Sequence, residues 1–299
     1  MAVSETIRAR RLPEPSAILA LLKPVTWFPP MWAFACGAVS SGASLGANAG
    51  LALAGIVLAG PVVCGMSQAA NDWCDRHVDA INEPGRPIPS GRIPGLWGLW
   101  IALAMTGFSL VYATALGAWA FLATMLAVLA AWAYSAEPVR LKRSGLWGPL
   151  AVGLSYETLP WITGVAVLSG MAPEPRVLLV ALLYGLGAYG IMVLNDFKAL
   201  EGDRATGLRS LPVALGPERA ARVACWGMAL PQVAVALLLW SWGRPVEAGT
   251  VALLLAAQAL AMRRLLADPK GRAPWYNGTG VLLYVTGMMA AAIALRSLG

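Results

Sequence analysis

Two clusters of acidic side chains are the part of this sequence best suited to chemistry. The first cluster consists of Asn71, Asp72, Asp75 and Asp79. On a helix these spacings place all four side chains on one face. Four oxygen-bearing side chains on one face suit a hard cation such as Mg²⁺. Three like charges repel one another unless a cation lies among them, so we predict that Asp72, Asp75 and Asp79 ligate a metal ion.

The second cluster follows more than a hundred residues later and consists of Asp196, Glu201 and Asp203. Asp196 and Asp203 are seven residues apart, and Glu201 could take the place of either. Gly202 and Gly207 are expected to interrupt a helix in this segment. Two acidic clusters on one chain predict a site that holds a diphosphate through metal ions, with Mg²⁺ as the expected ion.

Basic side chains near both clusters fit the anion that would bridge such metals. We predict that Asn71, together with four cations, contacts the diphosphate: Arg86, Lys142, Lys198 and Arg204. Guanidinium and ammonium groups neutralise phosphate oxygens directly. The alternative is that these cations only mark the cytoplasmic side of a membrane. For Arg140 and Arg143 both explanations stay open.

The composition is that of an integral membrane protein. Of the 299 residues, 58% are hydrophobic and only 12% are charged, whereas soluble domains carry about 25% charged residues. The apolar stretches are continuous rather than alternating, so they predict helices, each long enough to span a bilayer. Nine spans are expected, near residues 25–41, 50–70, 95–115, 117–135, 147–169, 177–197, 221–242, 246–264 and 278–297.

The basic residues are distributed unevenly between the two sides that nine spans define. Of the 22 Lys and Arg, 19 lie before the first span, in the loops after the even-numbered spans, or at the span ends that border those loops (Arg222, Arg263 and Arg264). The other side holds Arg176, Arg244 and Arg296. The positive-inside rule therefore places the N-terminus in the cytoplasm and the C-terminus on the opposite side of the cell inner membrane. Because topology explains the positive charge, no nucleic-acid partner is expected.

A partial internal repeat predicts the architecture. Asn71-Asp72-Trp73 at the end of the second span recurs as Asn195-Asp196-Phe197 at the end of the sixth. The simplest arrangement is an all-α bundle of two four-helix units closed by a ninth helix, with both clusters facing one cavity. We expect a single domain over residues 1–299, with residues 1–23 as a cytoplasmic N-terminal segment. Residues 16–22 could form a short helix on the membrane surface.

One further carboxyl group lies inside a predicted span. Glu157 falls within the fifth span, next to Tyr156. An ionisable residue within a membrane is a functional candidate by default. A buried, hydrogen-bonded structural role is the alternative, and the sequence leaves the two open.

The spacing of the first cluster resembles the first aspartate motif of the intramembrane prenyltransferases that make ubiquinone, menaquinone, heme and chlorophyll precursors. Residues 71–93 as a whole are similar to the chlorophyll and bacteriochlorophyll synthase branch of that family, with the bacteriochlorophyll members the closer match. Residues 23–32 (KPVTWFPPMW), 195–198 and 201–204 support the same branch.

The resemblance implies an enzyme that transfers a C20 prenyl group, geranylgeranyl or phytyl, from its diphosphate to the propionate of bacteriochlorophyllide. It implies Mg²⁺ as cofactor and Asp72, Asp75, Asp196 and Asp203 as catalytic residues. The second cluster departs from the family's commoner D-x-x-x-D spacing, so which of its three acids touches metal stays open. Membrane lipid surrounds such an enzyme, and pigment–protein assemblies are further candidate partners.

Two alternatives remain at this point. A related prenyltransferase could use another acceptor, namely chlorophyllide or a precursor of a quinone or of heme. A transporter could use the acidic clusters as an ion site, but transporter sites usually lie near the middle of the bilayer. Both clusters here fall at span ends beside basic loops, which favours diphosphate chemistry.

Overall fold

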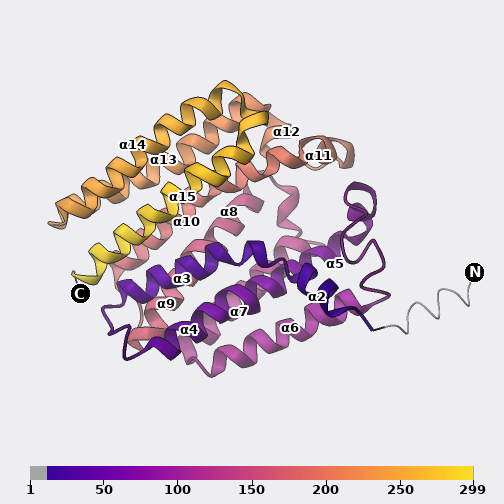
Figure 1. Cartoon of the computed structure of the whole chain (residues 1–299), viewed down its shortest axis with the longest axis horizontal. Helices are drawn as coiled ribbons and strands as arrows, with labels where there is room; N and C mark the ends of the chain where they lie inside the picture. The colour runs from indigo at the N-terminus through magenta and orange to yellow at the C-terminus, as the bar shows by residue number, and fades with distance from the viewer. Residues whose placement is uncertain (1–11, 299) are drawn as a thin grey trace, which may run out of the picture.

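The protein is a bundle of helices in a computed structural model that describes residues 12–298 (Figure 1). Residues 1–11 of the predicted N-terminal segment lie outside the described residues. The helices, with η marking short 3₁₀ or π segments, are α2 (Pro15–Leu22), η1 (Pro24–Thr26), α3 (Phe28–Ser40), α4 (Ala49–Val57), η2 (Leu58–Cys64), α5 (Gly65–Asn82), α6 (Trp97–Thr114), α7 (Ala118–Ser135), η3 (Leu141–Arg143), α8 (Trp147–Gly153), η4 (Leu154–Thr158), α9 (Leu159–Ser169), α10 (Pro175–Asn195), η5 (Asp196–Ala199), α11 (Leu200–Thr206), α12 (Leu211–Leu215), α13 (Pro217–Ser241), α14 (Pro245–Ala267) and α15 (Pro269–Arg296).

The predicted membrane spans are present in the part of the chain that the structure describes. Eight continuous helical segments there are long and apolar enough to cross a bilayer. Residues 15–26 and 28–40, which are bent by 55° at Trp27, bring the number to nine when the pair is counted as one broken span. The chain is therefore an all-α, multi-pass membrane protein, as predicted. The short helix expected over residues 16–22 is α2.

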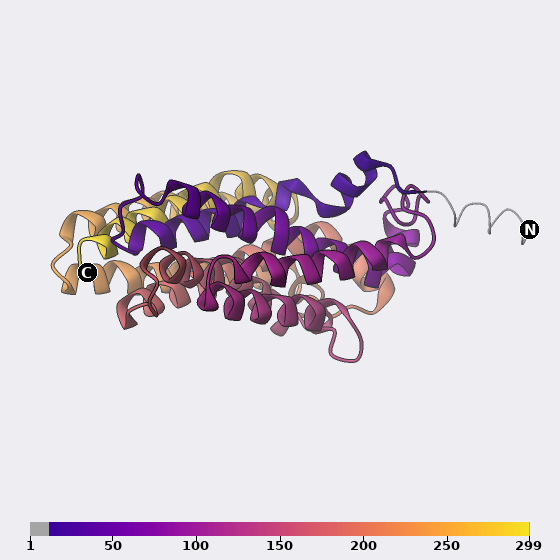
Figure 2. The ribbon, with the colours of Figure 1, turned by 90° about the horizontal axis from the view of Figure 1, so that it is seen from below.

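The helices run side by side along the long axis of the molecule (Figures 1 and 2). Helices α5, α6 and α7 pack together on one side, and α10, α13, α14 and α15 pack together on the other. Between them α3 packs against α9, and α15 also contacts α3. Helix α3 belongs to the first span of one predicted four-helix unit and α9 to the first span of the other, so the two units meet at this pair. The last span, α15, closes the bundle.

Two glycines set the distance between α3 and α9. A Cβ atom added to Gly37 would lie 2.0 Å from the backbone oxygen of Trp161, and one added to Gly164 would lie 2.3 Å from that of Phe34. Small residues let helix backbones approach closely in membranes, where burial of apolar surface drives association only weakly. The seam of the bundle therefore depends on backbone-to-backbone packing.

Two spans are interrupted by π-helical turns, which the sequence analysis did not predict. The segment η2 joins α4 to α5, and η4 joins α8 to α9. Pro61 lies within η2 and Pro160 follows η4 by two residues. Because proline lacks a backbone N–H, it cannot complete the regular helical hydrogen-bond pattern. Such π turns often occur at functional sites, and both of these border the cavity described next.

Candidate active site

A cavity of about 630 Å³ lies within the bundle, between α3, η2, α5, α7, η4, α10 and α15. Much of its wall is apolar, with Phe34, Leu58 and the alanines of α7 among its side chains. Its polar lining includes Asn71 of α5, from the first copy of the repeated motif, and Asn195 and Asp196 from the second copy. The prediction that both acidic clusters face one cavity is met only in part, because Asp72, Asp75 and Asp79 are not among the side chains that line it.

The first acidic cluster is carried by α5, the helix that the spacing predicted. Asp72 is only 1% exposed and accepts hydrogen bonds from Lys23 Nζ at 2.6 Å and Arg86 NH1 at 3.3 Å. The same Arg86 nitrogen donates to Asp79 at 2.8 Å. Asp72 and Asp79 therefore share one guanidinium group, as expected for two residues on one helix face.

Asp75 faces a different set of cations. It accepts a hydrogen bond from Arg140 NH2 at 3.0 Å and one from Lys142 Nζ. Both bases come from the loop that follows α7. The expectation that all four oxygen-bearing residues act together on one face is thus only partly met, because Asp75 turns toward this loop while Asp72 and Asp79 turn toward Arg86.

The ion pairs change the acidity of the bases. Burial opposes the charge on Arg86, but its hydrogen bond to Glu83 and the charges of Asp72 and Asp79 outweigh burial and raise the pKa of Arg86. Burial lowers the pKa of Lys142, and the nearby Asp75 carboxylate offsets only part of that shift. The neighbouring carboxylates thus favour the charged form of Arg86 more strongly than burial opposes it, whereas for Lys142 the effect of burial is the larger of the two.

The oxygen atoms of the first cluster suit a magnesium ion. Within residues 12–298, no three His, Cys, Asp or Glu side chains converge closely enough to hold a metal, because each carboxylate of α5 is turned toward a base. Yet Oδ2 of Asp72 is buried and has no hydrogen-bond partner among the described residues. A buried carboxylate oxygen without a partner is costly, and a hard cation at this position would satisfy it.

The residues of the second cluster are divided between the cavity and the surface. Asp196 is half-buried and lines the cavity, as does the more exposed Lys198. Glu201 and Arg204 are exposed on α11. Asp203 is half-buried and takes part in an interaction. The structure therefore brings Asp196 and Lys198 to the same cavity as Asn71, and it leaves Glu201 and Arg204 facing outward.

The expected interruption of the helix in this segment is half right. Helix α11 ends before Gly207, whose φ of 72° lies in the left-handed region that favours glycine. Gly202, however, lies inside α11, so its predicted helix-breaking role is wrong. A Cβ atom there would lie 3.4 Å from the Asn82 side chain. That distance is an ordinary van der Waals contact, so α11 lies beside the end of α5 without requiring glycine at this position.

The sequence analysis missed Lys23 as a site residue. Its backbone adopts a φ of 47°, which is uncommon for a residue with a side chain, and the conformation turns the chain from α2 into η1. This turn brings Lys23 Nζ within 2.6 Å of Oδ1 of Asp72, where the two groups form an ion pair. The available signal was Lys23-Pro24, because a residue before proline is restricted and often ends a helix.

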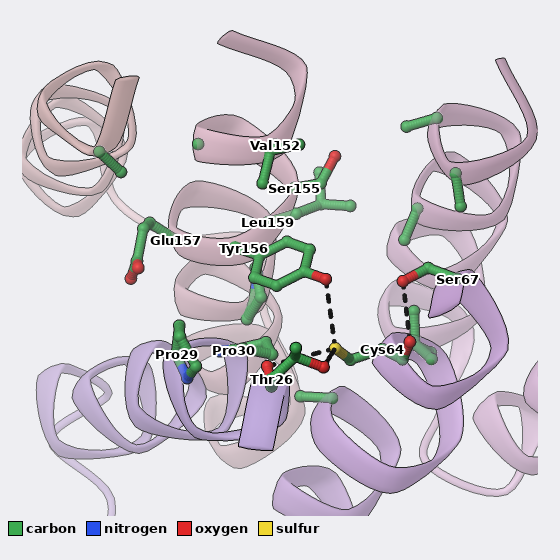
Figure 3. Close-up of a pocket in the computed structure, with 18 of the residues that line it drawn as sticks. Thr26, Pro29, Pro30, Cys64, Ser67, Val152, Ser155, Tyr156, Glu157 and Leu159 are labelled. Carbon is green, nitrogen blue, oxygen red and sulfur yellow. Dashed lines mark hydrogen bonds between the residues drawn. The ribbon is translucent and has the colours of Figure 1, made fainter. Parts of the chain in front are cut away.

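A second missed group joins the two π-helical segments across the cavity (Figure 3). The hydroxyl of Tyr156 in η4 accepts a hydrogen bond from Gln68 Nε2 at 2.9 Å and contacts Cys64 Sγ at 3.3 Å. Thr26 Oγ1 lies 3.5 Å from the same sulfur. These side chains are neither charged nor evenly spaced, so no sequence pattern marked them.

Comparison with known proteins decides the family. Residues 23–294 match the model of the UbiA prenyltransferase family. The chain belongs to this family. Its prenyltransferase relatives include the bacteriochlorophyll synthase 33 kDa chain of Cereibacter sphaeroides, which is 63% identical over 298 residues covering 100% of this chain and 99% of the relative. The chloroplastic chlorophyll synthase of Arabidopsis thaliana is 37% identical, covering 92% and 73% of the two chains.

Solved structures of the UbiA family share the fold. A UbiA homolog from Archaeoglobus fulgidus, bound to GPP and Mg²⁺, superposes with a TM-score of 0.72 over 94% of this chain and 99% of that one, at 23% identity. The arrangement of helices around the cavity is therefore that of the UbiA prenyltransferases.

Proposed function

We propose that this prenyltransferase transfers a C20 prenyl group from its diphosphate to the propionate carboxylate of bacteriochlorophyllide and releases diphosphate. The observation that carries the proposal is the identity of 63% over the whole chain to a bacteriochlorophyll synthase, against 37% to a chlorophyll synthase. An apolar cavity with acidic and basic groups at one end supports the same chemistry.

The diphosphate end of the donor would bind between the two acidic segments. Asp72 forms ion pairs with Lys23 and Arg86, and Asp75 forms ion pairs with Arg140 and Lys142. When a diphosphate enters with its counter-ions, these bases can exchange carboxylate oxygens for phosphate oxygens without leaving the site. Lys198 reaches the same cavity from the second segment. The departing negative charge would thus develop where cations are already held.

Magnesium fits the donor set at this end. Asn71, Asp72, Asp75 and Asp79 from α5, and Asp196 from η5, would hold it. Asp203 is half-buried and near enough to Asp196 to act on it electrostatically, whereas Glu201 is exposed. The ion would neutralise the phosphate oxygens and so make diphosphate a better leaving group. The UbiA homolog from Archaeoglobus fulgidus, bound to GPP and Mg²⁺, supports a divalent ion here.

The rest of the cavity would shield the reacting carbon. As the bond to diphosphate breaks, strong positive charge would develop on the allylic carbon. The apolar wall formed by residues such as Phe34 and Leu58 would keep water away from it. The acceptor needs no general base, because a carboxylic acid with an ordinary pKa of about 4 is already ionised at neutral pH. One carboxylate oxygen attacks the carbon, and the ester forms as the bond to the diphosphate oxygen breaks.

The proposed setting is the cell inner membrane with a cytoplasmic N-terminus. In Figure 1, α2 and α11 lie at one end of the bundle and α15 ends at the other. The loops at the α2 end carry most of the Lys and Arg residues, as the positive-inside rule requires for the cytoplasmic side. The donor diphosphate would then enter from the cytoplasm while its tail stays among the helices. Lipid would cover the exposed apolar side chains, and pigment–protein assemblies would take up the product.

The test is a transfer assay in membranes that contain the protein. Geranylgeranyl diphosphate and bacteriochlorophyllide are supplied with and without Mg²⁺, and esterified pigment is measured by chromatography. Product that requires Mg²⁺ and is lost in Asp72→Ala, but not in Glu174→Gln at the far end of the bundle, is the expected result. Prenylation of a quinone precursor instead, or a preference for chlorophyllide in direct competition, would contradict the proposed acceptor.

A further inference from the structure

One carboxyl group lines the cavity away from both acidic clusters. Glu157 belongs to the π-helical segment η4 and is 4% exposed. Figure 3 shows its carboxyl group pointing away from Tyr156 and Cys64, toward the side of the cavity where Pro29 of α3 lies. The two adjacent residues of η4 therefore serve different parts of the cavity.

One oxygen of the Glu157 carboxyl group is buried without a partner in the part of the chain that the structure describes. Oε2 has no hydrogen-bond partner among the described residues, and no Lys or Arg of residues 12–298 forms an ion pair with this carboxyl group. Its titratable neighbours are Cys36 of α3 and Tyr284 of α15. The hydroxyl of Tyr284 is already used, because it donates to the backbone oxygen of Tyr184 at 2.6 Å.

The other polar groups of the cavity wall contrast with Glu157. Tyr156 is engaged by Gln68, Thr26 Oγ1 donates to the backbone oxygen of Lys23 at 2.8 Å, and Thr163 Oγ1 donates to that of Leu159 at 2.6 Å. Among the described residues that line the cavity, the buried oxygen without a partner belongs to Glu157. Leaving a buried polar atom unpaired is costly, so this side chain is best explained by a partner that enters the cavity.

The chemistry of the two substrates decides which of them that partner is. A prenyl tail is a hydrocarbon and offers no hydrogen-bond acceptor, whereas a tetrapyrrole macrocycle carries carbonyl oxygens on its rim. A charged carboxylate without a counter-ion is unfavourable in an apolar wall. The uncharged acid, in contrast, has one O–H to donate. The uncharged Glu157 side chain is therefore suited to donate a hydrogen bond to a carbonyl oxygen of the macrocycle.

We propose that Glu157 binds the tetrapyrrole acceptor by donating a hydrogen bond to a carbonyl oxygen on the rim of the macrocycle. This assignment rests on the proposed function, because it needs bacteriochlorophyllide as the acceptor. Glu157 would orient the macrocycle so that its propionate points toward the end of the cavity that carries Asn71 and Asp196. The diphosphate site and the acceptor site would then use separate sets of side chains.

The experiment compares Glu157→Met, which keeps length but cannot donate, with Glu157→Gln, which keeps a donor. Thr163→Val is the matched control, because that hydroxyl is satisfied within its own helix. Glu157→Met should raise the KM for bacteriochlorophyllide roughly tenfold, in line with the loss of one buried hydrogen bond. The KM for geranylgeranyl diphosphate should not change. Glu157→Gln and Thr163→Val should retain the wild-type KM for both substrates.

A spectroscopic signature separates this role from a structural one. In resonance Raman spectra of pigment bound to the purified protein, one carbonyl stretch should lie at lower frequency than in the free pigment. It should return to the free value in Glu157→Met and stay low in Glu157→Gln. Unchanged carbonyl stretches in Glu157→Met, or an equal rise of both KM values, would overturn the assignment while leaving the proposed function intact. A wild-type protein that does not bind bacteriochlorophyllide would overturn the proposed function, and the assignment with it.

Discussion

The two acidic segments share an Asn-Asp pair but are placed differently in the structure. In the first, Asp72 and Asp79 are buried and share Arg86, and Asp75 is held by the loop after α7. In the second, Asp196 lines the cavity, while Glu201 lies exposed on α11. A shared Asn-Asp pair therefore does not imply equal roles. In the first segment, Asp72, Asp75 and Asp79 are all held in ion pairs, and we call this set the ion-paired frame. The second segment contributes one carboxylate, that of Asp196, to the cavity wall.

The largest effect should follow from Asp72→Ala. The substitution removes the carboxylate with the unpartnered buried oxygen and leaves Lys23 without its ion-pair partner. Turnover of the transfer reaction should fall by at least about 10²-fold, the usual cost of losing a charged group that stabilises the transition state. Esterified pigment per amount of protein in the membrane is the measurement. Asp72→Asn keeps the shape of the side chain and serves as the control for folding. Near-normal activity in both variants would break the comparison, because the ion-paired frame would then be dispensable.

Asp196→Ala should have the next largest effect. Asp196 is the acid of the second segment that lines the cavity, so we expect turnover to fall by roughly 10-fold to 10²-fold, less than for Asp72→Ala. The Mg²⁺ concentration for half-maximal rate should rise in the same variant, which a titration of activity with Mg²⁺ measures. A loss equal to that of Asp72→Ala would show that the two segments contribute alike.

Lys23→Ala should act mainly on donor binding. Asp72 keeps its contact with Arg86 after the substitution, so the frame is retained while one cation for the diphosphate is lost. The KM for geranylgeranyl diphosphate should rise about tenfold, the effect expected from one charge-assisted hydrogen bond. The KM for the acceptor is the internal control. Lys23→Arg should restore much of the affinity, and failure of both predictions would remove Lys23 from the site.

Glu201→Gln should have the smallest effect. Its side chain is exposed on α11, and exposed substitutions away from a site usually change little. Activity and Mg²⁺ dependence should stay within about twofold of the unaltered protein. A large loss would place a metal ligand on α11 and would restore the symmetry between the two segments that the structure breaks.

The residues show why prediction from sequence succeeded for the helices and only in part for the site. Continuous apolar stretches specify membrane helices because the bilayer leaves the backbone few alternatives, and the spacing of Asp72, Asp75 and Asp79 required a helix to be meaningful. Side-chain partners depend on packing between distant segments. The contact of Asp75 with Arg140 and Lys142 joins residues more than sixty positions apart, and no local pattern records it.

The π-helical segments were unpredictable for a related reason. Both lie within stretches whose overall hydropathy predicts continuous membrane helices, so the pattern does not mark where a turn changes. In η4 the neighbouring side chains of Tyr156 and Glu157 point in different directions. Glu157 was marked in the sequence as an acid within a span, but only the structure shows that Oε2 has no partner among the described residues. Lys23 was hidden by the opposite problem, since its role follows from a rare backbone angle.

The contact between Gly37 and Gly164 has a consequence for how this enzyme can diversify. Each glycine lies against the backbone of the opposite helix, so a single added methyl group must push α3 and α9 apart. Phe34 of α3 and Pro160 of α9 line the cavity, and they would move with their helices. The volume of the cavity therefore depends on two glycines that do not line it. A substitution at either glycine could change which substrates fit, even when every cavity-lining residue stays the same.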